Sequence, residues 1–465
     1  MMLRIKLLFP TLFLSFLPIL AFFAVRAQKL NKNDKVIVAN LTTHIRYLAD
    51  PKLEGRRMGT PGDKAASDYI ISELSKAGLR PKGDNNGWTQ DFTLDQGRAI
   101  SDDTWFSIND QPLVRFKEYF PVDFSATGQV SGSPAIALQE SGVPWFLDIR
   151  ELLEGKPNRS GLAVLIRARA AACAKKGATA LILYNSSKLS DHLGFDPRDK
   201  PEAAVIPIIY ITAAAKRKYL KDESASVDIR IKVGFTEVMR TGHNVVGWLD
   251  NGAASTVIIG AHYDGLGSVP ASTQAAADSL GADDNASGVA GMIELARLLG
   301  ASKLRNNNYL FIAFSGSELA SAGSAWFVQH PETDLKKVNY MINMDMIGRL
   351  SDTLTVGGYG TSPLWAPVWN GIRDKKYISI RNINTVATTG DQLAFYRASI
   401  PVLTFTTGWH TEDHGPGDNA DKINYNYPGE LQVLKFIYSV IEGANARGRA
   451  TFTATADNQS LTGTP

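Results

Sequence analysis

The chain has 465 residues, of which 44% are hydrophobic, and 49 basic against 46 acidic residues leave a net charge of +3. This length predicts two or three domains with a sizeable core, and the near-neutral charge gives no reason to expect a nucleic-acid partner. Cys173 is the single cysteine, which excludes an intramolecular disulfide.

The N-terminus has the pattern of an export signal. Basic residues precede an apolar run from residue 7 to residue 25. Val25 and Ala27 are small residues at the positions that a signal peptidase requires for cleavage after Ala27. We therefore expect residues 1–27 to be a cleaved signal peptide and the mature protein to be periplasmic or secreted. Because the run is longer than most signal sequences, an uncleaved membrane anchor is the alternative. No later stretch of the sequence is apolar enough to span a membrane.

Residues 28–99 are predicted to begin the main domain. Residues 39–48 and 64–77 have the apolar spacing of amphipathic helices, and residues 88–94 read as a strand. From residue 100 to residue 236 short β-like runs alternate with turns around one helix, and no histidines and acidic residues cluster there. This pattern predicts an inserted module that contributes no chemistry of its own.

Residues 237–446 alternate strands with helices. The predicted strands are 244–249, 256–261, 309–314, 340–344 and 401–406, and the predicted helices are 286–299, 324–328 and 430–442. Strands separated by helices predict an α/β fold with a mostly parallel mixed sheet and helices on both faces. Residues 447–465 are rich in Thr and Ala with little apolar content, which predicts a disordered tail.

Residues of metal-ligand type follow these predicted strands. They are His262, Asp264, Asp283, Asp284, Glu318, Asp345, His410, His414 and Asp418. In open α/β sheets ligands bind where the carboxyl ends of the strands meet, so we expect these side chains to lie close together. Nitrogen and oxygen ligands without a thiolate suit zinc, with cobalt or manganese as alternatives. Two histidines and three carboxylates are enough for two ions that share one bridging carboxylate.

With these residues the sequence resembles a known family. It is similar to the di-zinc aminopeptidases of metallopeptidase family M28, in the form with an inserted protease-associated domain. The resemblance covers residues 36 to 442 approximately. The motifs that carry it are HIRYLADPKLEGRRMGTPG, AHYDG, GADDNASG, AFSGSELASAGS, NMDMIGR and HTEDHGPGDNADKINY.

The resemblance implies a zinc exopeptidase fold with two Zn²⁺ ions. His262 and Asp345 would bind one zinc, Glu318 and His414 the other, and Asp284 would bridge them. The region from 100 to 236 would be the protease-associated domain.

The resemblance also implies supporting roles around the ions. Asp264, which we count among the catalytic residues, and Asp418 would hold the histidine rings. Asp283 and His410 would lie near the site without binding metal. The peptide bond between Asp284 and Asn285 would be cis.

One position departs from the family pattern. The family has two consecutive glutamates after the strand that ends at Phe314. The second corresponds to Glu318, and the first, which is the general base, is replaced by Ser317. A serine hydroxyl does not accept a proton near neutral pH as a carboxylate does, and such groups contribute about 10²–10⁴-fold to the rate.

A second departure is Gln392, where relatives of this architecture often have histidine near the substrate. Asp391, Glu412 and Asp413 are candidates for a substitute base, and the sequence places none of them next to the reacting water.

The sequence thus predicts an exported zinc exopeptidase, most simply an aminopeptidase that hydrolyses the N-terminal peptide bond of a peptide substrate with a zinc-activated water. Ser317 motivates one alternative, an inactive pseudo-peptidase that binds zinc. Arg349 keeps a carboxypeptidase open, because a substrate carboxylate needs a cation. A glutaminyl cyclase-type transferase is less favoured, because the full ligand set of a two-metal site is present. The sequence does not predict side-chain preference or oligomeric state.

Overall fold

The computed structural model describes residues 30–155, 159–191, 193–196, 201–222, 224–267, 279–372, 378–421 and 425–455. The predicted signal peptide, residues 1–27, and the last part of the predicted tail, residues 456–465, lie outside these ranges. None of the helices within the described ranges combines the length and apolar character needed to cross a bilayer.

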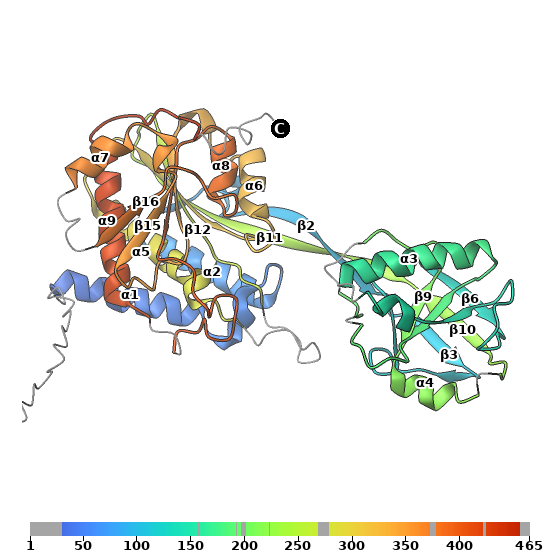
Figure 1. The fold of residues 1–465 in the computed structure, drawn as a ribbon. Coiled ribbons are helices and arrows are strands. Elements are labelled where there is room, and N and C mark those ends of the chain that lie inside the picture. Colours follow the sequence, from blue (N-terminus) through green and yellow to red (C-terminus); the bar gives the residue numbers. More distant parts are fainter. Residues whose placement is uncertain are drawn as a thin grey trace, which may run out of the picture.

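Over the described residues, a mixed sheet of nine strands forms the centre of the main domain (Figure 1). Its strands, in spatial order, are β1 (Arg80–Pro81), β11 (Phe235–Leu249), β13 (Asn308–Phe314), β12 (Thr256–His262), β14 (Val338–Met344), β17 (Val402–Thr406), β15 (Thr353–Gly357) and β16 (Ser379–Asn382), with β2 (Thr89–Ile100) paired to β11. The four central strands β13, β12, β14 and β17 are parallel. Strand β11 is antiparallel to β13, and β15 is antiparallel to β17. The predicted mixed α/β sheet is confirmed.

Helices cover both faces of this sheet, as predicted (Figure 1). They are α1 (Lys32–Leu48), α2 (Pro61–Lys76), α5 (Gly288–Ala301), α7 (Trp365–Gly371) and α9 (Tyr427–Asn445) on one face, and α6 (Ala322–Gln329) and α8 (Gln392–Arg397) on the other. Successive strand residues point to opposite faces. Phe311 of β13 accordingly packs with the first group of helices, and Ile312 packs with the second. Because both faces are covered, the central strands are mostly apolar.

The two N-terminal helices begin at side chains that cap them. Asn31 accepts a hydrogen bond from the Asp34 amide, and the Asp34 carboxylate accepts one from the Asn31 amide. Thr60 caps α2, and Pro61 occupies its first turn, where its missing N–H costs nothing. The Thr60 cap fixes where the loop between α1 and α2 ends, and this loop reaches the candidate site described below.

Residues between β2 and β11 form a separate body with two four-stranded sheets over the described residues (Figure 1). One contains β4 (Gln111–Pro112), β3 (Trp105–Ile108), β10 (Ile229–Val233) and β6 (Gly128–Gly132), and the other β5 (Tyr119–Pro121), β9 (Ile208–Ile211), β8 (Leu181–Tyr184) and β7 (Trp145–Asp148). Helices α3 (Arg159–Lys175) and α4 (Ala213–Tyr219) pack on them, and the body has its own apolar clusters. Its place in the chain matches the predicted insert, and its kinship with protease-associated domains stays a prediction.

The prediction of a disordered tail from residue 447 is wrong as far as Thr455. The Thr453 amide donates a hydrogen bond to the Thr361 carbonyl (2.8 Å), and the Thr455 amide donates to the hydroxyl of Tyr396 (2.9 Å). Phe452 packs near the ring of Tyr396. The tail is held by its backbone and one aromatic ring, and a composition poor in apolar residues does not reveal such contacts.

Candidate metal centre

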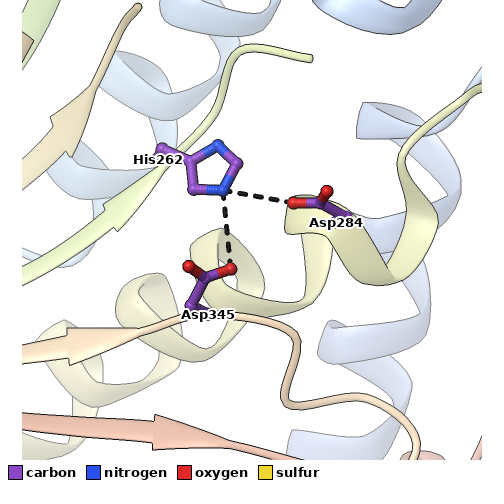
Figure 2. A group of neighbouring side chains, drawn as sticks. All are labelled: His262, Asp284 and Asp345. Carbon is purple, nitrogen blue, oxygen red and sulfur yellow. Dashed lines mark ion pairs between the residues drawn. The ribbon is translucent and has the colours of Figure 1, made fainter. Parts of the chain in front are cut away.

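His262, Asp284 and Asp345 converge at the carboxyl ends of two adjacent strands (Figure 2). His262 is the last residue of β12, and Asp345 directly follows β14. The Nε2 atom of His262 lies 3.2 Å from Oδ1 of Asp284 and 3.5 Å from Oδ1 of Asp345. Asp284 comes from the turn η4 (Ala282–Ser287) that leads into α5, and its peptide bond to Asn285 is cis, as expected.

His414 and Glu318 complete a second group on the other side of Asp284. His414 lies in the loop after β17, and Glu318 lies after β13. The Nε2 atom of His414 is 3.0 Å from Oδ2 of Asp284 and 3.3 Å from Oε1 of Glu318. Each carboxylate oxygen of Asp284 therefore faces one histidine, and the five predicted ligands form two groups that share Asp284.

Asp264 supports the site mainly by accepting hydrogen bonds from backbone amides. Its carboxylate accepts hydrogen bonds from the amides of Ser317 (3.0 Å) and Glu318 (3.2 Å), which holds the loop after β13. The Nδ1 atom of His262 is 3.1 Å from the backbone carbonyl of Asp264 and 3.7 Å from its carboxylate. The predicted contact with the ring exists, and the hydrogen bond to the ring uses the carbonyl.

Asp418 differs from the prediction that it holds a histidine ring. Its two carboxylate oxygens accept hydrogen bonds from the amides of Asp283 (2.7 Å) and Asp284 (3.0 Å). Two amides in succession offer their donors to one carboxylate, so Asp418 fixes the backbone of the turn that carries Asp284. It positions the shared carboxylate rather than an imidazole.

Asp283 and His410 lie beside the site and outside both ligand groups, as the resemblance implies. One oxygen of Asp283 accepts a hydrogen bond from the Gly348 amide (2.8 Å), and the other is 3.3 Å from Nε2 of His410. The other ring nitrogen of His410 is 3.3 Å from Glu412, which also accepts a hydrogen bond from Arg349 (3.0 Å). The guanidinium of Arg349 is thus engaged by a carboxylate of the protein itself.

Asp391 is fully buried, and neither of its carboxylate oxygens has a hydrogen-bond partner among the described residues. Burial raises the pKa of Asp391 to about 6, and the positive charge of His262 opposes the shift. Gln392, the second departure from the family pattern, donates to the Thr389 carbonyl (2.6 Å) and accepts from Asn343 (3.0 Å). Both residues lie beneath the site without joining either ligand group.

Asp413 is a further carboxylate that lies beside the ligands. Ligand atoms of Asp284, Asp413 and His414 all lie within 4.8 Å of one another. Burial and the negative charge of Asp284 raise the pKa of Asp413 to about 6. The sequence identified Asp413 only as a candidate base, because its distance from Asp284 in the chain hides their contact.

Arg56 also supports the site. It lies within the motif HIRYLADPKLEGRRMGTPG, and the sequence alone predicts no role for it. It ends the turn η1 (Pro51–Arg56) between α1 and α2 and is fully buried. Its guanidinium donates hydrogen bonds to the carbonyls of Tyr263 (2.7 Å), Leu48 (2.6 Å), Leu280 (2.8 Å) and Gly281 (3.0 Å).

Three of these bonds join the end of β12 to the residues that lead into the turn of Asp284, and the fourth reaches the end of α1. Burial lowers the pKa of Arg56, and the charges of Asp418 and Asp284 oppose that shift. Gly281 has a φ of +60°, and a Cβ there would meet the Asp284 carbonyl and the Arg56 guanidinium, so this position requires glycine. Arg56 therefore fixes the backbone beneath the site and places a positive charge behind its carboxylates.

The charge balance of the site favours cations. Burial acts to lower the pKa of His262, but Asp264, Asp284 and Asp345 raise it well above its ordinary value. Asp284 and Glu318 raise the pKa of His414 to about 11. Conversely, although burial opposes it, the two histidines lower the pKa of Asp284. Without a metal the imidazoles take up protons to balance the carboxylates, and metal ions would replace those protons.

The donor set fits zinc. Each group offers an imidazole nitrogen and carboxylate oxygens, no thiolate is present, and the ligands come from the ends of rigid strands or from loops that backbone hydrogen bonds hold. A carboxylate with one oxygen toward each histidine could be shared by two neighbouring ions.

Comparison with known proteins finds a peptidase family that part of the chain resembles. Residues 244–436 match the model of peptidase family M28. Over these residues the chain is similar to the peptidases of family M28. The match contains all five predicted ligands and the loops that hold them, whereas Arg56 and the insert lie before it.

Similar proteins include two bacterial aminopeptidases. The chain is 26% identical over 322 residues to an aminopeptidase of Pseudomonas aeruginosa (strain UCBPP-PA14), covering 63% of this chain and 54% of that protein. It is 30% identical over 264 residues to aminopeptidase YwaD of Bacillus subtilis (strain 168), covering 53% of each. The chain thus spans about half the length of these relatives.

Among solved structures, the chain is similar to BSAP, a zinc aminopeptidase from Bacillus subtilis. The TM-score is 0.50 at 20% identity, over 89% of this chain and 95% of that one. At this identity the likeness establishes the fold.

Proposed function

We propose that the protein is a zinc-dependent aminopeptidase with two zinc ions, which removes the N-terminal residue from peptides. The observation that supports it most is the position of Asp284, whose two oxygens lie 3.2 Å from one histidine and 3.0 Å from another. Each histidine has a further carboxylate beside it, Asp345 or Glu318. The M28 match and the aminopeptidases among the similar proteins agree with this chemistry.

In the proposed reaction, zinc supplies Lewis acidity that polarises the scissile carbonyl and acidifies a water. The residues of the chain supply geometry. Asp264 holds the loop of Glu318, Asp418 holds the turn of Asp284, and Arg56 joins that turn to the end of β12. The ligands are therefore held in place before the substrate arrives, which is the condition for efficient electrostatic stabilisation.

Ser317 predicts reduced activity. Ser317 directly precedes the ligand Glu318, and its amide donates a hydrogen bond to the Asp264 carboxylate. Its side chain has no carboxylate with which to take a proton from the water. A site that retains its ions and lacks this base is expected to be slower by about 10²–10⁴-fold than one that has both.

An aminopeptidase is favoured over a carboxypeptidase by the state of Arg349. A carboxypeptidase needs a free cation for the terminal carboxylate of its substrate, and the Arg349 guanidinium already donates to Glu412 at 3.0 Å. We further propose that the protein is exported to the periplasm or secreted, and that the inserted body limits the size of peptides that reach the site.

The proposal is tested by the zinc content and peptidase activity of the purified protein. We expect close to two zinc ions per chain by elemental analysis and hydrolysis of an aminoacyl-anilide, with no hydrolysis of the same compound carrying an acetylated amine. The variant Ser317→Glu should raise kcat by about 10²–10⁴-fold, or roughly 3–5 kcal/mol of barrier, and change KM little.

Ser351→Glu is the matched control, because it adds the same charge at an exposed position. It should leave kcat unchanged. A protein without zinc under metal-replete conditions would overturn the assignment of the site. Two bound zinc ions with no activity in either Ser317 form would favour the zinc-binding pseudo-peptidase.

A further inference from the structure

Three carboxylates surround His414, and the proposed second ion uses only two of them. Asp284 and Glu318 lie 3.0 Å and 3.3 Å from its Nε2 atom, and Asp413 lies within the same group of ligand atoms. Two carboxylates held this close repel each other unless one takes up a proton or a cation lies between them. The contact between Asp284 and Asp413 is therefore a feature that a metal ion would stabilise.

An oxygen of Asp413 is available to bind such a metal ion. Its Oδ1 atom is buried and has no hydrogen-bond partner among the described residues. A buried polar atom without a partner costs free energy, so its persistence needs a compensating interaction. The backbone amide of Asp413 donates to the His410 carbonyl (3.1 Å), which closes the turn that brings Asp413 and His414 to Asp284.

The neighbouring carboxylates do not share this position. Glu412 accepts a hydrogen bond from Arg349 and lies beside His410, so its charge is already balanced. Asp391 is buried beneath the site and belongs to neither ligand group. Among the candidate acids outside the five predicted ligands, Asp413 alone has its ligand atoms beside Asp284 and His414.

We propose that Asp413 is a further metal ligand, which binds the ion held by His414, Glu318 and Asp284. This inference rests on the proposed two-zinc site. It makes the two ions unequal: the His414 ion has four protein ligands, and the His262 ion has three, namely His262, Asp345 and Asp284. Zinc sites with four protein ligands are closed and structural in character, whereas sites with three keep a position for water or substrate. The His262 ion is then the one with the open position.

The experiment is a zinc titration of the metal-free full-length protein against a chromophoric chelator. The wild-type protein should show two binding steps, with the tighter one due to the His414 ion. Asp413→Asn should weaken the tighter step by about 10–100-fold and leave the other unchanged. Cobalt substitution gives a second readout. The absorption spectrum of bound cobalt depends on its ligands, so the spectrum of one of the two ions should change in Asp413→Asn.

Glu412→Gln is the matched control, since it neutralises the adjacent carboxylate in the same loop. It should preserve both binding steps and both cobalt spectra. Asp413→Glu retains a carboxylate and should bind zinc more tightly than Asp413→Asn, which guards against a general effect on folding.

Two zinc ions bound by Asp413→Asn with wild-type affinities would overturn the proposal. If the same variant also lost turnover, Asp413 would act on the reacting water and not on the ion, which equally overturns the ligand role. A wild-type protein that binds no zinc is a different failure, because it removes the proposed function before Asp413 is tested.

Discussion

At the carboxyl edge of the main sheet, His262 and several carboxylates are buried against one another and His414 is exposed, whereas charged residues of the inserted body pair in contact with solvent. Asp283 and Asp284 are buried, and so is His262 between two carboxylates. In the insert, Arg230 pairs with Asp110 with their side chains 49% and 75% exposed, and Lys232 pairs with Asp103 in a similar setting.

The difference shows where the fold accepts an energetic cost. Exposed ion pairs contribute little to stability and cost little to form. Buried charges are expensive unless they are paired or bind metal, so a concentration of them marks a site where function requires it. The main domain carries such a cost at this sheet edge, and the insert has two apolar clusters, with pairs such as Arg230–Asp110 at the surface.

The largest effect is expected from removing a histidine of the candidate site. His262→Ala and His414→Ala should each lose one zinc ion, because each histidine serves a different ligand group. The Lewis acidity of an ion is worth several kcal/mol, so we expect kcat to fall on the order of 10³-fold or more. Elemental analysis and aminoacyl-anilide hydrolysis measure both effects.

His330→Ala is the control for these variants, because His330 is exposed and stacks on Trp326 away from the ligands. It should bind two zinc ions and keep wild-type activity. Full zinc occupancy in His262→Ala would break the comparison, because the buried histidine would then be structural.

The sequence predicted the central strands because they are buried on both faces. The strand predicted at 256–261 is observed as β12 (Thr256–His262), and the one predicted at 309–314 is β13 (Asn308–Phe314). Strands β15 and β16 were missed. Both are short and partly exposed, and the sequence of β16 is SIRN, so neither has the apolar run of a central strand.

The convergence of the five ligand residues was also predictable, because the carboxyl ends of parallel strands meet at one edge. The atoms that hold them were not. Asp418 binds two backbone amides, and Arg56 binds four backbone carbonyls. Backbone groups are the same at every residue, so no sequence pattern identifies which of them a buried side chain will reach. That the ligands hold zinc stays a prediction for the experiments above.

A smaller effect is expected at Arg56, which sharpens the contrast between buried and exposed charge. Arg56→Met should lower the free energy of unfolding by about 3–5 kcal/mol, because it leaves buried carbonyls without donors and buried carboxylates without a nearby cation. Denaturant unfolding of the metal-free protein measures the change. Zinc affinity should also fall, since the turn of Asp284 loses its link to β12.

Arg46→Met is the matched control, because Arg46 pairs with Asp421 on the surface, with side chains 62% and 76% exposed. It should change the free energy of unfolding by at most about 1 kcal/mol. Equal stability of Arg56→Met and the wild-type protein would contradict the role assigned to the buried arginine.

The smallest effect on the metal site is expected from deleting the insert. Ile100 of β2 and Phe235 of β11 are antiparallel partners, and the Ser101 amide donates to the Gly234 carbonyl at 2.9 Å. Replacing residues 101–234 by Asn-Gly should therefore close β2 and β11 as a two-residue hairpin, since this dipeptide favours the turn that such hairpins use. The ligands and the residues that hold them all lie outside the deleted part, so elemental analysis should still find the zinc content of the full chain.

The same deletion in the His262→Ala background is the control, and it should lose one ion as in the full chain. If the deleted protein folds, as judged by cooperative unfolding, and binds no zinc, then the insert contributes to the metal site and the two regions are not separate in function.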